Sequence, residues 1–362
     1  FLLRATSKGI ASKRGILLLA VTAIELCIAN GSMTLSIPGS TWEEPRELAN
    51  AIQSEVDSSP PPRLYRDSTA TLLPDAWIEQ SDRGRLAEVV SWERSTLLPK
   101  HHLDSGVAII GSHTTLTSAD WQSFFRLAKT RPFGDSRENF DEIWNIVSAR
   151  YTSRTKVLPR LDGTELVTSA SEDVKLYSHE ESLPHAWIVR DVQVLPKLID
   201  RSRESIEQRT REVFFDGDSL RNLRSIAIIE TDEAPSLLGS SSTRDSDGMD
   251  PGFCTVTDYS SHRVEIDATL IEPGYMVFND AYDQGWQAAR VTNGGIEKLH
   301  VYRANRVMRA VFLPAGQHQI VYTYRPRSLI VGAMVSASAW CLLIAFGVRW
   351  AIGRKSYRIA ES

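Results

Sequence analysis

"YDQGWQAARVTNGGIEKLHVYRANRVMRAVFLPAGQHQIVYTYRP", residues 282 to 326, reads as short β-rich segments separated by turn residues. Within it, "NGG" at 293–295 is typical of a tight hairpin turn, and "PAG" at 314–316 of a second turn. Upstream, "CTVTDYS", "HRVEIDATL" and "YMVFND" continue the pattern at a spacing of roughly 8–12 residues. We therefore predict a C-terminal antiparallel β-sandwich over residues 253–327.

An apolar segment without charged residues follows at once, from Leu329 to Val348. About 20 apolar residues match the thickness of a bilayer core when they are helical. Small residues within it, such as Gly332 and Ser336, allow helices to pack closely in a membrane. The alternative is a core helix of a soluble domain, which is rarely uncharged over this length. We predict a transmembrane helix at 328–348.

A second apolar segment, "GILLLAVTAIELCIANGSM", covers residues 15–33 and contains Glu25. A signal peptide would also combine the preceding Lys13 and Arg14 with an apolar run and small residues near Ala29, but a carboxylate inside the run argues against it. We predict a transmembrane helix here too. Glu25 is then an intramembrane acidic candidate, either a protonated carboxyl that helps helices pack or a functional group near a lipid-linked substrate.

Basic residues flank the outer ends of both apolar segments, and cytoplasmic flanks are rich in lysine and arginine. The basic loop 1–14 and the basic tail 349–362 are therefore expected in the cytoplasm, and residues 34–327 outside. The chain opens with "FLL" before its basic loop, so we expect it to begin inside a longer protein. The net charge of −4 gives no reason to expect a nucleic-acid partner.

The predicted external part begins with an α/β region at 34–237. Helices are expected in "EEPRELANAIQSEV", from about Ser118, in "SRENFDEIWNIV" and in "RSRESIEQRTREVFF". "SIAIIET" is typical of a buried strand, and a strand pair is expected around Leu183-Pro184. Residues 238–252 are a Ser/Asp/Gly linker. The expected fold class is a membrane protein in which two transmembrane helices flank this α/β region and the β-sandwich.

No complete catalytic or metal-binding motif is found, so no catalytic residue, metal or cofactor is assigned. Cys27, Cys254 and Cys341 form no CxxC pair. "HHLDSG" at 101–106 is weighed as a metal cluster, but adjacent histidines on a strand point to opposite faces, which favours a surface loop. "DSDGMD" at 245–250 resembles the start of a calcium loop, yet valine stands where that loop needs glutamate.

The turn before the middle of the sandwich carries candidate glycan contacts. Tyr282 and Trp286 offer rings on which the apolar face of a sugar can stack, and Asp280 and Asp283 offer exposed carboxylates. The alternative for Trp286 is the core between the two sheets, which is the common place of a tryptophan in a sandwich. The alternative for the two aspartates is an ordinary surface turn.

The C-terminal residues resemble YfhO-like bacterial membrane proteins over 250–340, and "VKLYSHEESLPHAWIV" extends the resemblance to 174–190. The shared features are Gly285-Trp286, Arg303-Ala304-Asn305, Pro314-Ala315-Gly316-x-His318 and Tyr324-x-Pro326. His185 stands where that family more often has arginine. The Glu25 region is similar to an acidic position in the helix before the family's external domain. Residues 34–170 match in general layout alone.

The resemblance implies a polytopic glycosyltransferase of the GT-C fold in the bacterial cytoplasmic membrane, with a polyprenyl-phosphate-linked sugar as donor. It places the catalytic carboxylate in a loop before Phe1, so no catalytic residue carries over. The expected partners are membrane lipid, the lipid-linked sugar and an envelope glycan acceptor, which the external domain would position. The alternative is a non-catalytic, membrane-anchored binding or assembly module of the cell envelope.

Overall fold

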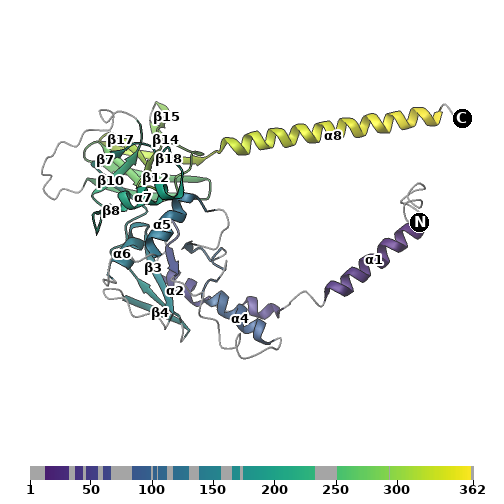
Figure 1. The fold of residues 1–362 in the computed structure, drawn as a ribbon, viewed down its shortest axis with the longest axis horizontal. Coiled ribbons are helices and arrows are strands. Elements are labelled where there is room, and N and C mark those ends of the chain that lie inside the picture. Colours follow the sequence, from purple (N-terminus) through teal and green to yellow (C-terminus); the bar gives the residue numbers. More distant parts are fainter. Residues whose placement is uncertain are drawn as a thin grey trace.

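The structure is a computed structural model. It describes residues 13–31, 37–43, 46–55, 60–66, 84–98, 101–103, 105–111, 117–129, 138–155, 165–171, 174–232, 251–292 and 294–359. These residues form a β-rich body with several sheets, which confirms that part of the predicted fold class. Helices α1 (Lys13–Gly31) and α8 (Arg327–Ile359) project from the body toward the same side, and the outer ends of both helices lie far from it (Figure 1).

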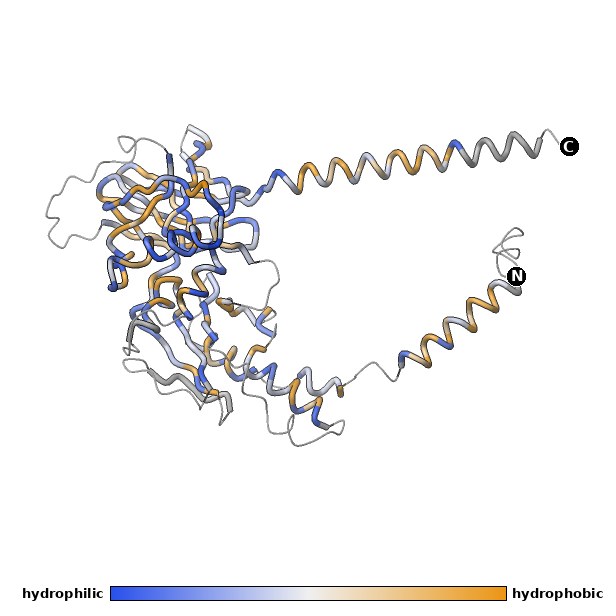
Figure 2. Tube along the Cα trace, in the orientation of Figure 1, coloured by the Kyte–Doolittle hydropathy of each residue, from blue (hydrophilic) through white to orange (hydrophobic). Residues whose placement is uncertain are grey.

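Helix α8 carries the apolar segment that the sequence indicates. Its stretch Arg327–Arg349 spans 23 residues and contains an 18-residue window with a mean hydropathy of 2.2, and its side chains are exposed (Figure 2). Among the described helices, it is the one long and apolar enough to cross a membrane. The apolar part of α1, Gly15–Gly31, is shorter. The predicted apolar helix after the β-rich segment is therefore confirmed.

The last part of the chain forms an antiparallel sheet of five strands, here called the outer sheet. In spatial order its strands are β11 (Gly252–Tyr259), β12 (Arg263–Leu270), β18 (Gly316–Tyr324), β14 (Trp286–Thr292) and β15 (Gly295–Leu299). Along β12, Val264, Ile266 and Ala268 are buried, and the residues between them face outward, as expected for a half-buried strand. Thr292 pairs with Gly295, which confirms the predicted hairpin turn between β14 and β15.

A sheet of six strands, here called the central sheet, packs against the outer sheet. Its strands are, in order, β6 (Ala186–Val189), β13 (Gly274–Phe278), β17 (Met308–Leu313), β16 (Tyr302–Ala304), β10 (Ile226–Glu230) and β7 (Asp191–Leu195). Met276 and Phe278 share one core with Ile320 and Tyr322 of the outer sheet. The alternate residues of β13 belong to a second core on the other face, so this strand is buried on both faces.

The sandwich is larger than the sequence indicates. We predicted it within residues 253–327, but β6, β7 and β10 of the central sheet come from before residue 238. Their short apolar runs, such as "AWIV" and "IAIIE", show that they are buried, but not which strands they pair with. The predicted linker lies outside the described residues up to 250, and Gly252 already begins β11.

A third sheet, here called the first sheet, contains five strands from the α/β region. In order they are β2 (Ala108–Ile110), β1 (Arg63–Arg66), β3 (Ala149–Thr155), β5 (Val174–Ser178) and β4 (Glu165–Ser171). Helix α2 (Glu47–Glu55) packs on the face that carries Leu64, and α4 (Gly84–Ser95) adjoins it. The strands before and after Leu183-Pro184 both form, but β5 lies in the first sheet and β6 in the central sheet.

Three further helices join the first sheet to the central sheet. They are α5 (Ala119–Lys129), α6 (Glu138–Ile146) and α7 (Arg203–Phe214), close to the predicted helices. The ring of Phe124 lies 5.8 Å from Trp144 and 5.0 Å from Phe214, within a core that includes residues of both sheets. The short elements η2 (Gly39–Trp42), β8 (Phe215–Asp216) and β9 (Ser219–Leu220) complete the body.

Candidate functional site

The loop between β13 and β14, residues 279–285, carries three of the four candidate glycan contacts and leads into the fourth, Trp286. Backbone hydrogen bonds fix both of its ends. Asn279 N donates to His185 O (2.7 Å), Tyr282 N to Val307 O (2.9 Å) and Arg325 N to Gly285 O (2.8 Å). The loop is therefore held to His185 just before β6, to the turn after β16 and to the residues just before α8.

Asp280 lies at the inner end of this loop and forms an ion pair with a buried cation. Its Oδ2 accepts a hydrogen bond from Arg309 Nη2 at 2.6 Å, and its Oδ1 lies 3.5 Å from Nη2 of Arg63 in the first sheet. The side chain of Arg309 is 0% exposed and that of Asp280 is 26% exposed. Burial lowers the pKa of the Arg309 guanidinium, and Asp280 opposes that effect.

Aromatic rings surround the Arg309 guanidinium. Its central carbon lies 3.8 Å from the ring centroid of Trp286, 4.8 Å from that of Phe278 and 5.2 Å from that of Tyr322. Nε and Nη1 of Arg309 have no hydrogen-bond partner among the described residues, so cation–π contacts with these rings take the place of hydrogen bonds. Asp280 and the rings thus stabilise one buried positive charge together.

The sequence left open whether Trp286 is an exposed ring for a sugar or a core residue between the two sheets, and its position is intermediate. Its ring is half-buried, packs at the margin of the core between the central and outer sheets, and lies 5.1 Å from the ring of Tyr324. Arg309 stacks on one of its faces. That stacked face is closed to a sugar, because a guanidinium already covers it.

Tyr282 and Asp283 also have partners within the body. The guanidinium of Arg303 lies over the Tyr282 ring, 4.6 Å from its centroid. Asp283 is exposed, and its Oδ1 accepts a hydrogen bond from Gly285 N at 2.7 Å. Burial and the Asp283 carboxylate raise the pKa of Tyr324. The structure therefore brings the four predicted contacts together in one loop, where Asp283 is the most accessible of them.

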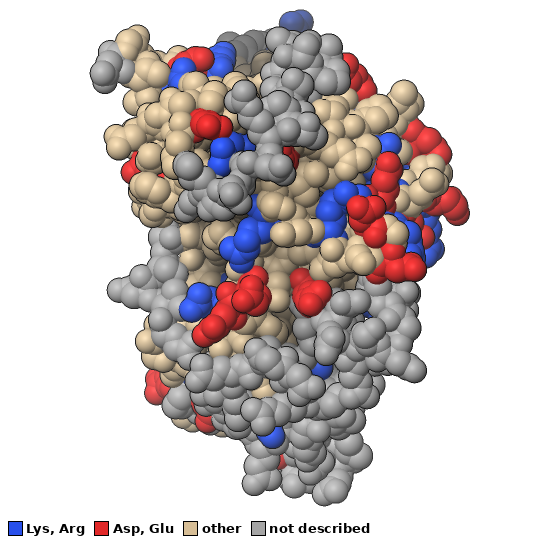
Figure 3. All heavy atoms as spheres, turned by 90° about the vertical axis from the view of Figure 1, so that its left-hand side faces the viewer, with Lys and Arg blue, Asp and Glu red and all other residues tan. Residues whose placement is uncertain are grey.

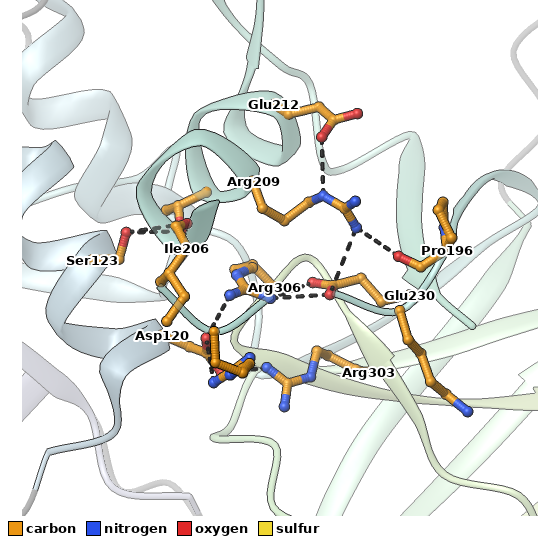
Figure 4. Close-up of polar contacts among 12 residues, drawn as sticks. Asp120, Ser123, Pro196, Ile206, Arg209, Glu212, Glu230, Arg303 and Arg306 are labelled. Atoms are coloured by element: carbon orange, nitrogen blue, oxygen red, sulfur yellow. Dashed lines mark hydrogen bonds and ion pairs between the residues drawn. The ribbon is translucent and has the colours of Figure 1, made fainter. Parts of the chain in front are cut away.

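A second charged network lies behind the loop, between α5, α7 and the central sheet (Figure 4). Arg306 is fully buried and donates two hydrogen bonds of 3.0 Å to Glu230 and one of 2.5 Å to Asp120 Oδ1. Arg303 donates to the other oxygen of Asp120, and Arg201 donates to both. Arg209 of α7 lies near Glu230 and pairs with Glu212.

The chain must bend sharply to bring Arg303 and Arg306 into this network. Asn305 and Arg306 both have a left-handed backbone, with φ of 43° and 68°. Asparagine adopts this conformation readily, but an arginine there is uncommon. Asn305 also accepts a hydrogen bond from Ile228 N (2.9 Å), which ties the turn to β10. Burial alone would raise the pKa of Asp120, but Arg303, Arg306 and Arg201 lower it below its ordinary value.

The remaining sequence candidates lie elsewhere. Glu25 is exposed on α1, away from the body (Figure 1). The His101 ring meets Trp42 edge-on at 5.3 Å, and Asp104 of the same motif lies outside the described residues, as does the 245–250 motif. Within the described ranges, no group of three histidine, cysteine, aspartate or glutamate side chains is arranged to hold a metal ion.

Sequence reasoning did not single out Arg309, Arg306, Asp120 or Glu230. A signal for two of them is present, because Arg309 interrupts the apolar run "VMRAVFL" and Glu230 ends the apolar run "IAIIE". A charge within a buried strand requires a partner. The sequence does not identify these partners, because Arg309 pairs with Asp280, 29 positions away, and Glu230 pairs with Arg306, 76 positions away.

No family model matches the chain, and neither the curated proteins nor the solved structures compared with it give a match.

Proposed function

We propose that this chain is a membrane-anchored module of the bacterial cell envelope, whose β-rich body lies outside the cytoplasmic membrane and holds a glycan acceptor beside the bilayer. The observation that carries the proposal is the connection between β18 and α8, which consists of Arg325 and Pro326 alone. With α8 in the membrane, the end of β18 lies at the membrane surface.

The candidate loop is fixed to that same connection. A Cβ atom on Gly285 would lie 2.7 Å from the Tyr324 ring and 3.0 Å from Pro326 Cα, so the loop and the exit of β18 approach closely only because residue 285 is glycine. Arg325 N adds a hydrogen bond to Gly285 O. The exposed Asp283 therefore lies within a few residues of the proposed membrane surface, where a lipid-linked sugar donor presents its sugar.

The arrangement of the two helices supports the proposed topology. Both α1 and α8 point away from the body on the same side (Figure 1). Lys13 and Arg14 stand at the far end of α1, and the basic residues from Arg349 to Arg358 stand at the far end of α8. The positive-inside rule assigns both far ends to the cytoplasm. In this proposal α1 is the second span, and Glu25 lies within it.

The resemblance to YfhO-like proteins supports a role in GT-C-type glycosyl transfer from a polyprenyl-phosphate-linked donor. In this proposal the body contributes binding of the acceptor, and the sugar is transferred by another part of the parent protein. One observation favours the alternative of a non-catalytic assembly module: Asp280 and one face of Trp286 are occupied by Arg309. A glycan would then have the outer residues of the loop to contact.

A binding experiment on the whole chain distinguishes the two roles. The chain in lipid nanodiscs is mixed with bacterial envelope glycans, and the retained glycan is measured for three proteins. They are the wild type, a loop variant that replaces Asp283 and its exposed neighbour Gln284 with alanine, and the matched control Asp267→Ala on the outer face of β12. Loss of hydrogen bonds to a charged group predicts retention about tenfold weaker for the loop variant and unchanged for the control. Absence of retention by the wild type would contradict the glycan role and favour the assembly module.

A further inference from the structure

The network behind the loop contains more positive than negative charge. Among the described residues, its ion pairs join four arginines (Arg201, Arg209, Arg303, Arg306) to three carboxylates (Asp120, Glu212, Glu230), which leaves one positive charge uncompensated. A buried network that served stability alone would be expected to balance, because an unpaired charge is costly away from water. The uncompensated positive charge is therefore expected on a side chain that solvent or a ligand can reach.

Two of the four arginines provide that access. The side chain of Arg201 is 47% exposed and that of Arg303 is 21% exposed, whereas Arg306 is fully buried. Arg201 uses Nη2 for both oxygens of Asp120, and Arg303 uses Nη1 for one of them. The other guanidinium N–H groups of these two residues have no partner among the described residues. Both guanidinium groups meet at the same carboxylate, that of Asp120.

The surroundings hold these two forks in place. Asp120 is fixed from behind by Arg306, which is itself bonded to both oxygens of Glu230 (Figure 4). The Tyr282 ring supports the Arg303 guanidinium. The carboxylate of neighbouring Asp200 accepts hydrogen bonds from Ser202 and Ser205 at the start of α7, and among the described residues it forms no ion pair with Arg201. Donors that are ordered in advance bind an anion at a lower entropic cost.

On the face of the body opposite the two helices, basic and acidic side chains lie side by side (Figure 3). This face therefore has no long-range positive potential that would attract a polyanion, and such a potential does not explain the extra positive charge of the arginine network. What remains is a local site for one anionic group. Arginine forks match the geometry of a carboxylate or phosphate, because each presents two parallel N–H donors.

We infer that Arg201 and Arg303 form a binding site for an oxyanion, a carboxylate or a phosphate group. The ligand's oxygens accept the unused N–H donors of the two forks, and Asp120 keeps the forks oriented. This inference goes beyond the proposed function and does not depend on the membrane location. Tyr282 belongs both to this site and to the candidate glycan loop, so an acceptor bound at the loop would carry its acidic group here.

The test is a calorimetric titration of the full chain in detergent micelles at constant ionic strength. The probes are inorganic phosphate and glucuronate, with neutral glucose as the uncharged comparison. Saturable binding of at least one oxyanion and none of glucose is expected, and the stronger of the two identifies the source of the oxygens. Arg201→Gln should weaken binding about tenfold, the effect of one charge-assisted hydrogen bond or more.

Arg263→Gln is the matched control, because Arg263 is also 47% exposed and also pairs with a carboxylate, Glu265, but lies on the outer sheet. Binding should be unchanged in it. Arg303→Lys keeps the charge but loses the fork, and should also weaken binding. No saturable binding of either oxyanion, or an equal loss in Arg201→Gln and Arg263→Gln, would overturn the inference. Arg201→Gln changes an exposed side chain, so the result does not depend on a fragile variant.

Discussion

Replacing Asp280 with alanine tests whether one carboxylate stabilises the buried Arg309 cation. The substitution removes the hydrogen bond of 2.6 Å and the one carboxylate that pairs with Arg309 among the described residues, while Arg309 remains 0% exposed among aromatic rings. Removing one partner of a fully buried ion pair costs about 3–5 kcal/mol, because the other charge is left uncompensated. Asp280 is 26% exposed, and water can reach the vacated side, so we expect the low end, about 3 kcal/mol.

The assay is thermal unfolding of the full chain in detergent, followed by tryptophan fluorescence. For a body of this size, about 3 kcal/mol corresponds to a fall in melting temperature of roughly 6–12 °C. Asp267→Ala on the solvent face of β12 is the control, and it should change stability by less than about 0.5 kcal/mol. A double variant with Asp280→Ala and Arg309→Met should recover much of the loss, because an apolar side chain needs no charged partner.

Equal melting temperatures for Asp280→Ala and Asp267→Ala would refute this reasoning, because the rings alone would then suffice for Arg309. A double variant less stable than Asp280→Ala would refute it as well. That result would show that Arg309 contributes through packing on Trp286 more than its unpaired charge costs.

Three further outcomes are expected. Trp286→Ala should lower the free energy of unfolding by about 2–3 kcal/mol, less than for a fully buried tryptophan, and an unchanged melting temperature would make Trp286 an exposed platform instead. Burial, and to a lesser extent Arg154, lowers the pKa of His179 to about 4, so the unfolded chain takes up a proton there at a higher pH than the folded chain does. The free energy of unfolding should therefore fall as the pH drops from about 6.5 to about 4. His179→Gln should flatten this pH dependence in denaturant titrations. Membranes that carry this chain alone, supplied with polyprenyl-phosphate sugars and envelope polymer, should transfer no more sugar than empty membranes; transfer above that level would contradict the assignment of the body to acceptor positioning.

Local patterns in the sequence predicted most of the elements. The alternation of Val264, Ile266 and Ala268 with polar residues marks β12, and the turn residues after Thr292 mark the β14–β15 hairpin. Such patterns report which face of a strand is buried. They do not report its neighbours, and this is why the pairing of β6 with β13, nearly ninety positions along the chain, was not predicted.

The charged contacts could be predicted less well for the same reason. The loop that carries Asp280 and Trp286 was identified because aromatic and acidic residues in a turn are visible locally. Its partner Arg309 lies on another strand, and Arg63 lies in another sheet. Whether an aspartate in a turn is free or paired depends on chain segments that the fold brings together, so the sequence left both possibilities open.

The central claim is that the body lies outside the membrane and that the basic ends lie inside. Its most direct test is labelling with a membrane-impermeant maleimide in a variant without the three native cysteines. Ser219→Cys, exposed on β9, and Ser362→Cys, at the end of the basic tail, are the two reporters. Ser219→Cys should be labelled in intact cells, and Ser362→Cys should be labelled after permeabilisation only. Labelling of Ser219→Cys that requires permeabilisation would contradict the central claim.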